Sequence, residues 1–272
     1  MAQISAKEVM ALRAKTGLSM MECKKALQET NGDADAAEDF LRKKLKGKME
    51  TRTDRAAGEG RVDVLVADDG KSAVIVELRA ETDFTAKNEG FVEATRTIAS
   101  KALGAGAGDV TPTDDMNGIL EDMKISTGEN LSIARIHKLE GAGDAVFGSY
   151  VHHDGKTAVL LQGQGGIGDE VMRDICMHIA AAQPRPQGVT RDDVPESVIE
   201  KERKLALEMA MEQGKPEEIA KKMVEGKVNK LYADLALVEQ PFVKDPDKKI
   251  SELVPADGSV IAFKRWQVGE DA

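Results

Sequence analysis

The spacing of hydrophobic residues predicts three short helices at the amino-terminal end of the chain, within residues 4–46. Apolar side chains recur there every three or four positions, which is typical of one face of a helix. Capping boxes, in which a serine is followed three positions later by a glutamate, begin at Ser5 and Ser19, and Asp33 is expected to cap the third helix. We therefore expect a three-helix domain over residues 1–46, of a size that more often binds than catalyses.

The central part of the chain contains an internal repeat of strand-like segments. Residues 47–60 lack apolar periodicity and are bounded by glycines, so a linker is expected there. The period then changes to two, and the sequences at 69–76 and 154–161 match at a constant offset of 85 residues. In both, an Asp-Gly turn joins two strand-like runs, and a helix pattern follows. We predict two related core halves, at 61–140 and 141–194, each an antiparallel sheet backed by a helix, in an α+β fold.

The carboxyl-terminal third begins with a helical hairpin, predicted over residues 195–238. Its expected apolar positions are Ile199, Leu205 and Met209 in the first helix and Val224, Val228, Leu231 and Leu235 in the second. Such a pair either packs on the body or projects as a two-helix arm. Residues 239–272 include a final strand-like run and are expected to return to the core.

Charge and cysteine content narrow the classes of partner. The 272 residues carry a net charge of −10 at pH 7, which argues against nucleic-acid or acidic-membrane binding. Residues 1–55 are the exception, with 12 Lys or Arg against 9 Asp or Glu. The two cysteines lie far apart, so that neither a zinc site nor a disulfide framework is expected. There is no apolar stretch near 18 residues and no signal-like start, and we expect a soluble cytoplasmic protein.

One corner between a strand and a helix stands out at residues 80–88. Phe84 lies there between polar residues, although only 3% of the chain is aromatic. It is either a hydrophobic staple, with Thr82 or Asp83 capping the helix and the ring packing back, or a probe that contacts a partner. The second half makes the same corner with glycines and no aromatic residue at 163–168. The corner itself therefore does not require Phe84, and both interpretations stay open on the residues alone.

The glycines at 163, 165 and 168 have the spacing of a dinucleotide fingerprint. Their context differs, because the preceding strands form a hairpin and no returning strand follows. A glycine-rich turn without direct nucleotide binding is expected, and no cofactor. An enzyme that uses this turn for a nucleotide is the competing hypothesis, and a scaffold whose helical head recruits small domains is a third.

Adjacent histidines at 152 and 153, followed by Asp154, raise the question of a metal site. Successive residues of a strand point to opposite faces, so both imidazoles are not expected to share one ion, and no metal is predicted. The chain also lacks the spacings of nucleophilic or carboxylate-pair catalysis. These absences favour a protein that acts by binding.

Met20 and Met21 follow the second capping serine directly. Neighbouring side chains on a helix point about 100° apart, so at least one of the two is expected to leave the core of so small a domain. Flexible methionine side chains suit an adaptable contact surface.

With these motifs in view, the whole chain resembles bacterial-type elongation factor Ts. The motifs that carry the resemblance are Leu12-Arg13-x-x-Thr16-Gly17, Met20-Met21-Glu22-Cys23-Lys24-Lys25-Ala26-Leu27, Thr82-Asp83-Phe84-x-Ala86-Lys87-Asn88, Gly128-Glu129-Asn130, Gly148-Ser149-Tyr150, Met177-His178-Ile179-Ala180 and Gly214-Lys215-Pro216. Their order and spacing span nearly the whole chain.

The resemblance implies a guanine-nucleotide exchange factor for elongation factor Tu, with a ubiquitin-associated-like head and no covalent chemistry. It implies that the segment Thr82, Asp83, Phe84 and Thr85 disturbs the Mg²⁺ site of the partner, with Phe84 wedged between partner side chains. The other partner-binding positions that it implies are Leu12, Arg13, Met20 and Met21, toward the GTPase domain, and Gly128 and His152, toward another domain.

Overall fold

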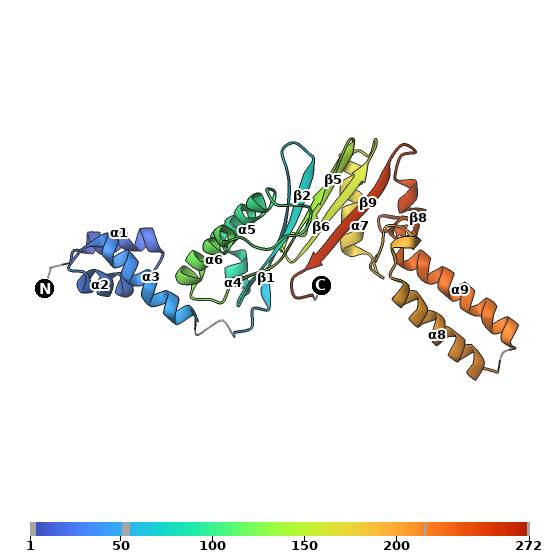
Figure 1. The fold of residues 1–272 in the computed structure, drawn as a ribbon, viewed down its shortest axis with the longest axis horizontal. Coiled ribbons are helices and arrows are strands. Elements are labelled where there is room, and N and C mark those ends of the chain that lie inside the picture. The colour runs from blue at the N-terminus through green and yellow to red at the C-terminus, as the bar shows by residue number, and fades with distance from the viewer. Residues whose placement is uncertain (1–3, 51–54, 215, 271–272) are drawn as a thin grey trace.

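The computed structural model describes residues 4–50, 55–214 and 216–270, the side chains of 45–50 excepted. Its first unit is a three-helix head (Figure 1). The helices are α1 (Ala6–Thr16), α2 (Met20–Glu29) and α3 (Ala34–Glu50). Both predicted capping boxes are present. The Ser5 hydroxyl accepts from the amide of Glu8, and the Ser19 hydroxyl accepts from the amide of Glu22, both at 3.3 Å. α3 continues to Glu50, four residues into the segment predicted as a linker.

Two antiparallel sheets form the core. The first contains β1 (Glu59–Val66), β2 (Ser72–Ala80), β4 (Ser132–Glu140) and β3 (Gly108–Asp109), in the order β1-β2-β4-β3. The second contains β5 (Ala145–Val151), β6 (Thr157–Gln164) and β9 (Ser259–Gln267), in the order β5-β6-β9. In both sheets the second strand of an Asp-Gly hairpin lies between two antiparallel neighbours. The α+β class is therefore confirmed, and β9 supplies the third strand of the second sheet.

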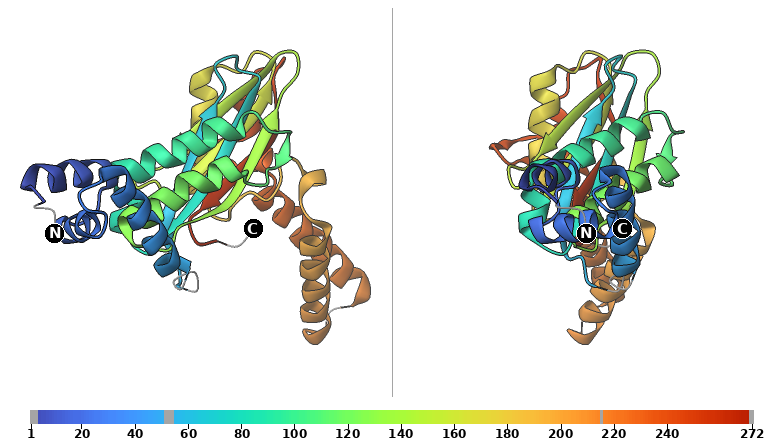
Figure 2. Two further views of the ribbon diagram at one scale, coloured as in Figure 1. Left: turned by 60° about the vertical axis from the view of Figure 1, so that its left-hand side comes forward. Right: turned by 90° about the vertical axis from the view of Figure 1, so that its left-hand side faces the viewer.

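The two sheets pack face to face, and helices cover their outer faces (Figure 2). The helices over the first sheet are α4 (Asp83–Lys87), α5 (Glu89–Ala102) and α6 (Asp114–Thr127); α7 (Asp169–Ala181) covers the second. Alternation along β2 produces this layering. Val74 and Val76 face the helices, whereas Ala73 and Ile75 pack with Leu160 of the other sheet.

The helix predicted after the first hairpin is divided at Asn88. The backbone there is extended (φ −64°, ψ 137°), and the Asn88 side chain accepts from the amide of Gly90 at 2.8 Å. Asn88 thus caps α5, which leaves α4 as a separate helix of five residues.

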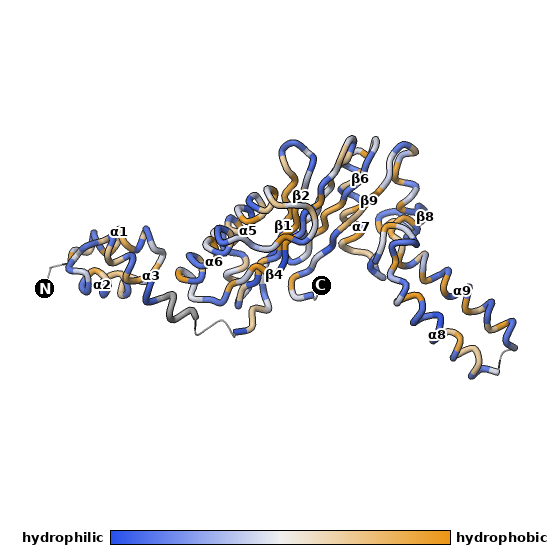
Figure 3. The backbone as a smooth tube through the Cα atoms, in the orientation of Figure 1, coloured by the Kyte–Doolittle hydropathy of each residue, from blue (hydrophilic) through white to orange (hydrophobic). Residues whose placement is uncertain are grey.

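Residues 196–235 form a projecting arm of two helices, α8 (Glu196–Glu212) and α9 (Glu217–Leu235) (Figures 1 and 3). The predicted apolar face of α9 is confirmed at Val224 and Val228. In α8 the prediction is confirmed at Ile199, which is buried, and wrong at Leu205 and Met209, which are 49% and 43% exposed. The residues of α8 that pack against α9 are Ile199, Ala206 and Ala210. The small side chains of Ala206 and Ala210 allow α8 and α9 to approach each other closely.

After the arm the chain returns to the core. The short elements on this path are η1 (Arg191–Asp193), which precedes the arm, and η2 (Leu237–Glu239), β7 (Pro241–Phe242), β8 (Asp245–Lys249) and η3 (Ile250–Glu252), which follow it. Leu237, Phe242 and Ile250 join the core beneath α7. None of the helices among the described residues combines the length and apolarity that crossing a membrane requires.

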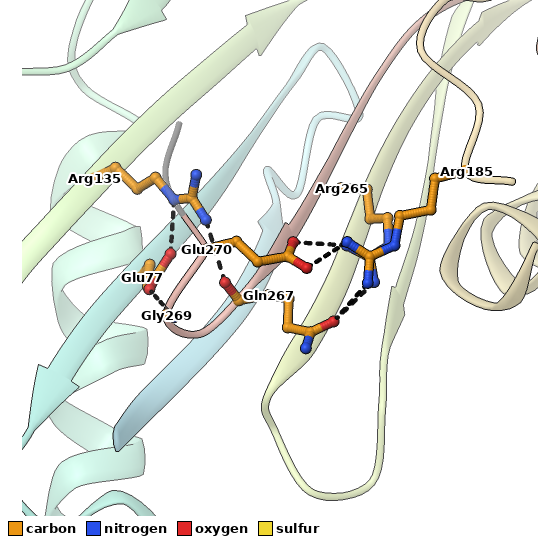
Figure 4. A network of polar contacts seen from close by, with 7 residues as sticks. All are labelled: Glu77, Arg135, Arg185, Arg265, Gln267, Gly269 and Glu270. Carbon is orange, nitrogen blue, oxygen red and sulfur yellow. Dashed lines mark hydrogen bonds and ion pairs between the residues drawn. The ribbon is translucent and has the colours of Figure 1, made fainter. Parts of the chain in front are cut away.

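A polar network fixes residues 269 and 270, which follow β9 (Figure 4). Glu77 of β2 is fully buried and accepts from Arg135 Nε at 2.6 Å and from the amide of Gly269 at 3.4 Å. The Glu270 carboxylate then bonds to the guanidinium groups of both Arg185 and Arg265. These contacts hold the tail against both sheets.

Candidate partner-binding site

Phe84 projects from the corner where β2 passes into α4. Thr82 is the N-cap of α4: its backbone is extended, and its hydroxyl accepts from the amide of Thr85 at 3.3 Å. The predicted capping role of Thr82 is confirmed. Phe84 is 83% exposed, so the staple interpretation is wrong. An aromatic ring at the second position of a capped helix is held out into solvent.

Asp83 carries a negative charge beside this ring. Lys87 Nζ lies 2.7 Å from Asp83 Oδ2, one helical turn away. This hydrogen bond, helped by the charges of Lys87 and Lys156, lowers the pKa of Asp83. Both side chains are exposed, so the pair contributes little to folding and stays available to a partner.

Thr85 points inward, in contrast to Phe84. It is 8% exposed, and its hydroxyl donates to Glu129 Oε1 at 2.7 Å. The same carboxylate accepts from the hydroxyl and the amide of Thr82, at 2.7 and 3.1 Å. Glu129 is not among the site residues predicted from the sequence. The motif that contains it was recognised, but nothing in the sequence shows that its side chain reaches a segment more than 40 residues earlier.

The turn at Gly128 ends α6, and the residues that follow it make a second hydrogen bond to the Phe84 corner. Gly128 is the C-cap of α6 in the left-handed region (φ 71°), where glycine has no Cβ penalty. Two residues on, the amide of Asn130 donates to Glu81 Oε1 at 2.7 Å. Each segment therefore supplies a carboxylate that binds the backbone of the other.

His152 lies at the tip of the second hairpin, where its Nδ1 is 2.9 Å from Asp154 Oδ1. The expectation that His152 and His153 point to opposite faces is wrong. Their ring centroids are 4.2 Å apart, because β5 ends at Val151 and both histidines belong to the turn. Strand alternation does not apply there.

The hairpin tip and the Phe84 corner lie at the same end of the core. Lys156 Nζ contacts Glu59 Oε2 at 2.6 Å, and Glu59 pairs with Ala80 in the register of β1 and β2. The corner begins directly after Ala80. The structure thus brings together the predicted residues of three segments far apart in the sequence: the corner, the Gly128 turn and the His152 tip.

The head presents its own exposed apolar side chains. Met20 and Met21 are both exposed, as is Arg13, and so is Met10, which the sequence interpretation did not single out. Leu12 is only 3% exposed and packs in the three-helix core. Any influence of Leu12 on a partner therefore acts through the shape of the head.

The head rests on the end of α6 that leads to Gly128. Ile125 packs into the apolar cluster of the head. A Cβ atom added to Gly17, in the turn between α1 and α2, would lie 3.6 Å from Cβ of Ser126. α6 thus connects the head to the turn that holds the Phe84 corner.

The glycine-rich turn before α7 is occupied by another segment of the chain. A Cβ atom at Gly165 would lie 2.1 Å from the carbonyl oxygen of Asp257, and one at Gly166 would lie 2.9 Å from Oδ2 of Asp257. Close backbone packing explains these glycines. A carboxylate beside the turn also repels the phosphates that a dinucleotide site must bind.

Comparison with known proteins identifies the relatives of this chain. Residues 81–270 match the protein family described as Elongation factor TS. The chain is 44% identical to Elongation factor Ts of Teredinibacter turnerae over 270 residues, which cover 98% of this chain and 91% of the relative. It is 43% identical to Elongation factor Ts of Hahella chejuensis (99% and 93% covered) and 38% identical to that of Halothermothrix orenii (98% and 93% covered).

Proposed function

The chain belongs to the elongation factor Ts family and is a nucleotide exchange factor for elongation factor Tu in translation elongation. We propose that Phe84 and Asp83 enter this partner and loosen its Mg²⁺ and phosphate site. An exchange factor of this family is not an enzyme in the covalent sense. It works by linkage: a protein that binds nucleotide-free partner more tightly than GDP-bound partner weakens GDP binding by the same factor.

The observation that carries the proposal is the exposure of Phe84 on a capped corner. An exposed ring contributes no burial to folding, whereas burying it in a partner is worth about 1.5–3 kcal/mol. Mg²⁺ demands near-octahedral oxygen coordination, so a small displacement of the elements around it reduces its retention. The Asp83 carboxylate beside the ring adds repulsion toward the GDP phosphates.

The remaining contacts in the proposal extend from this corner on both sides. Arg13, Met20 and Met21 bind the GTPase domain of the partner, with Leu12 supporting them from beneath. Gly128 and His152 face a second domain. The exposure of Arg13, Met20 and Met21, and the gathering of corner, turn and hairpin tip at one end of the core, support this arrangement.

The test is the release of labelled GDP from elongation factor Tu by the wild type and by Phe84→Ala. Loss of a transition-state contact worth about 1.5–3 kcal/mol corresponds to a rate about ten- to a hundredfold lower. Ile261→Ala is the matched control, because Ile261 is also an exposed large apolar residue but lies on β9. Equal release by Phe84→Ala and Ile261→Ala would remove Phe84 from the mechanism.

A further inference from the structure

The helix that presents Phe84 is too short to hold itself in place. α4 has five residues, and its hydrogen-bond ladder does not continue into α5 because the backbone of Asn88 is extended. Helices of this length are marginal in water, since the first turn fixes several residues for very few hydrogen bonds. The direction of Phe84 therefore depends on what anchors Thr82, two residues before it, and Thr85, directly after it.

Glu129 completes the cap of α4 from a distant part of the chain. In α1 and α2 the residue three positions after the capping serine is a glutamate, Glu8 or Glu22, which returns a bond to the serine amide. In α4 that position is Thr85, which has no carboxylate to accept a hydrogen bond from the amide of the capping residue, Thr82. Glu129 takes the place of the local glutamate, 47 residues after Thr82.

One carboxylate satisfies all three donors that face it. Oε2 accepts from the Thr82 amide at 3.1 Å, and Oε1 accepts from the hydroxyls of Thr82 and Thr85, both at 2.7 Å. Hydrogen bonds to an ionised acceptor are about twice as strong as neutral ones. The opposite bond, from the Asn130 amide to Glu81, locks the same two segments a second time.

We propose that Glu129 is a positioning residue for nucleotide exchange, which holds α4 so that Phe84 is presented in the orientation that it needs inside the partner. This inference rests on the proposed insertion of Phe84. A corner that is ordered before binding loses no further conformational entropy when it binds, and the full burial of the ring then acts on the partner. Without this brace, meaning the hydrogen bonds from Thr82 and Thr85 to Glu129, part of the binding free energy of the ring would be used to order α4.

The test is a double-mutant cycle read out as the rate of GDP release from elongation factor Tu. Glu129→Ala is expected to slow release about tenfold, from the usual contribution of hydrogen bonds to a charged group, and Glu129→Gln, which keeps one accepting oxygen, by less. In the Phe84→Ala background the same substitution should add almost nothing, because Glu129 acts through Phe84. In the free protein, amide hydrogen exchange over residues 82–88 should be faster in Glu129→Ala.

Asp193→Asn provides the matched control. Asp193 accepts from the amide and the hydroxyl of Thr190, both at 2.8 Å, in a capping box at the base of the arm. Its loss should leave GDP release unchanged. If Glu129→Ala fails to fold, the smaller effect of Glu129→Gln decides the same question.

The outcomes separate the two proposals. If Phe84→Ala releases GDP at the wild-type rate, the insertion of Phe84 and the role of Glu129 both fail. If Phe84→Ala slows release and the folded Glu129 variants do not, only the role of Glu129 fails. Equal slowing by Glu129→Ala with and without Phe84 also overturns it, since Glu129 would then act independently of the ring.

Discussion

Arg42 of α3 and Asp122 of α6 form an ion pair between the head and the core, with 2.6 Å between Nη2 and Oδ1. Both side chains are 61% exposed, and exposed ion pairs contribute about 0–1 kcal/mol. Ile125, three residues further along α6, packs into the apolar cluster of the head. Apolar contact, more than the ion pair, is therefore expected to hold the head in place.

Substitutions at these two contacts should have different effects on the shape of the protein. Arg42→Ala is expected to leave the radius of gyration unchanged and to lower the free energy of unfolding by less than about 1 kcal/mol. Ile125→Ser removes the apolar contact and should raise the radius of gyration, because the head is no longer held on α6. Small-angle X-ray scattering measures both. A larger radius for Arg42→Ala alone would show that the ion pair is the main connection.

The glycines of the turn before α7 should differ in their tolerance of alanine. Gly165 has a φ of 77° and no room for a Cβ atom, whereas Gly168 has an ordinary φ of −76° and no neighbour within 4 Å of an added Cβ. Gly165→Ala is therefore expected to lower the free energy of unfolding by about 2 kcal/mol or more, and Gly168→Ala by less than about 0.5 kcal/mol. Urea unfolding tests this. Equal costs at both positions would contradict the packing explanation.

Local signals made much of this fold predictable from the sequence. The capping boxes at Ser5 and Ser19 and the Asp-Gly hairpins depend on residues within four positions of one another. The face of α8 was not predictable in this way. Leu205 with Met209 has the same spacing as Ala206 with Ala210, and only the close approach of α9 selects the alanines. The division at Asn88 was missed although its signal is local, since the Asn88 side chain accepts from the amide of Gly90 two residues later.

The candidate site shows the same limit. Comparison of the two core halves indicated only that the corner does not require Phe84, and the resemblance to elongation factor Ts, more than this comparison, favoured an exposed ring. The brace at Glu129 and the approach of the hairpin tip to the start of β1 are contacts between distant segments. Spacing along the chain has no signal for such contacts, because they are fixed by how the two sheets and α6 pack together.

Glu77 is expected to stabilise the polar network between the two sheets. Its buried carboxylate lies 2.6 Å from Nε of both Arg79 and Arg135. Glu77→Ala leaves these two guanidinium groups without their common partner and is expected to lower the free energy of unfolding by about 3–5 kcal/mol. Glu121→Ala, which removes a surface pair with Lys124 in which the carboxylate is 43% exposed, should cost less than about 1 kcal/mol. Denaturant titration compares the two, and a cost for Glu77→Ala as small as that of Glu121→Ala would contradict the prediction.

His178 of α7 is buried at the base of the arm in a network that requires its neutral form. Its Nε2 lies 2.9 Å from Gln240 Oε1, and its Nδ1 accepts from the amide of Val243 at 3.3 Å. Gln240 in turn donates to the carbonyl oxygens of Pro184 and Asp234. A proton on Nδ1 would face the Val243 amide, so protonation is incompatible with this arrangement.

The stability of the protein should therefore fall as the solution becomes mildly acidic. Burial lowers the pKa of His178 below its ordinary value of 6.5, against the smaller effect of the bond to Gln240. Between 6.5 and this lower value the unfolded chain binds a proton that the folded chain does not. The free energy of unfolding therefore decreases as the pH falls through that window, by at most about 1.4 kcal/mol per pH unit from this group.

Urea unfolding between about pH 7.5 and about pH 5.5 measures this dependence. His178→Gln lacks the titrating group, and its stability should decrease less than that of the wild type over the same window, although it starts from a lower value because the packing around Gln240 changes. Identical pH dependence in the two proteins would show that His178 gains its proton as readily when folded as when unfolded. The network with Gln240 and Val243 would then not be the one that the folded protein maintains in solution.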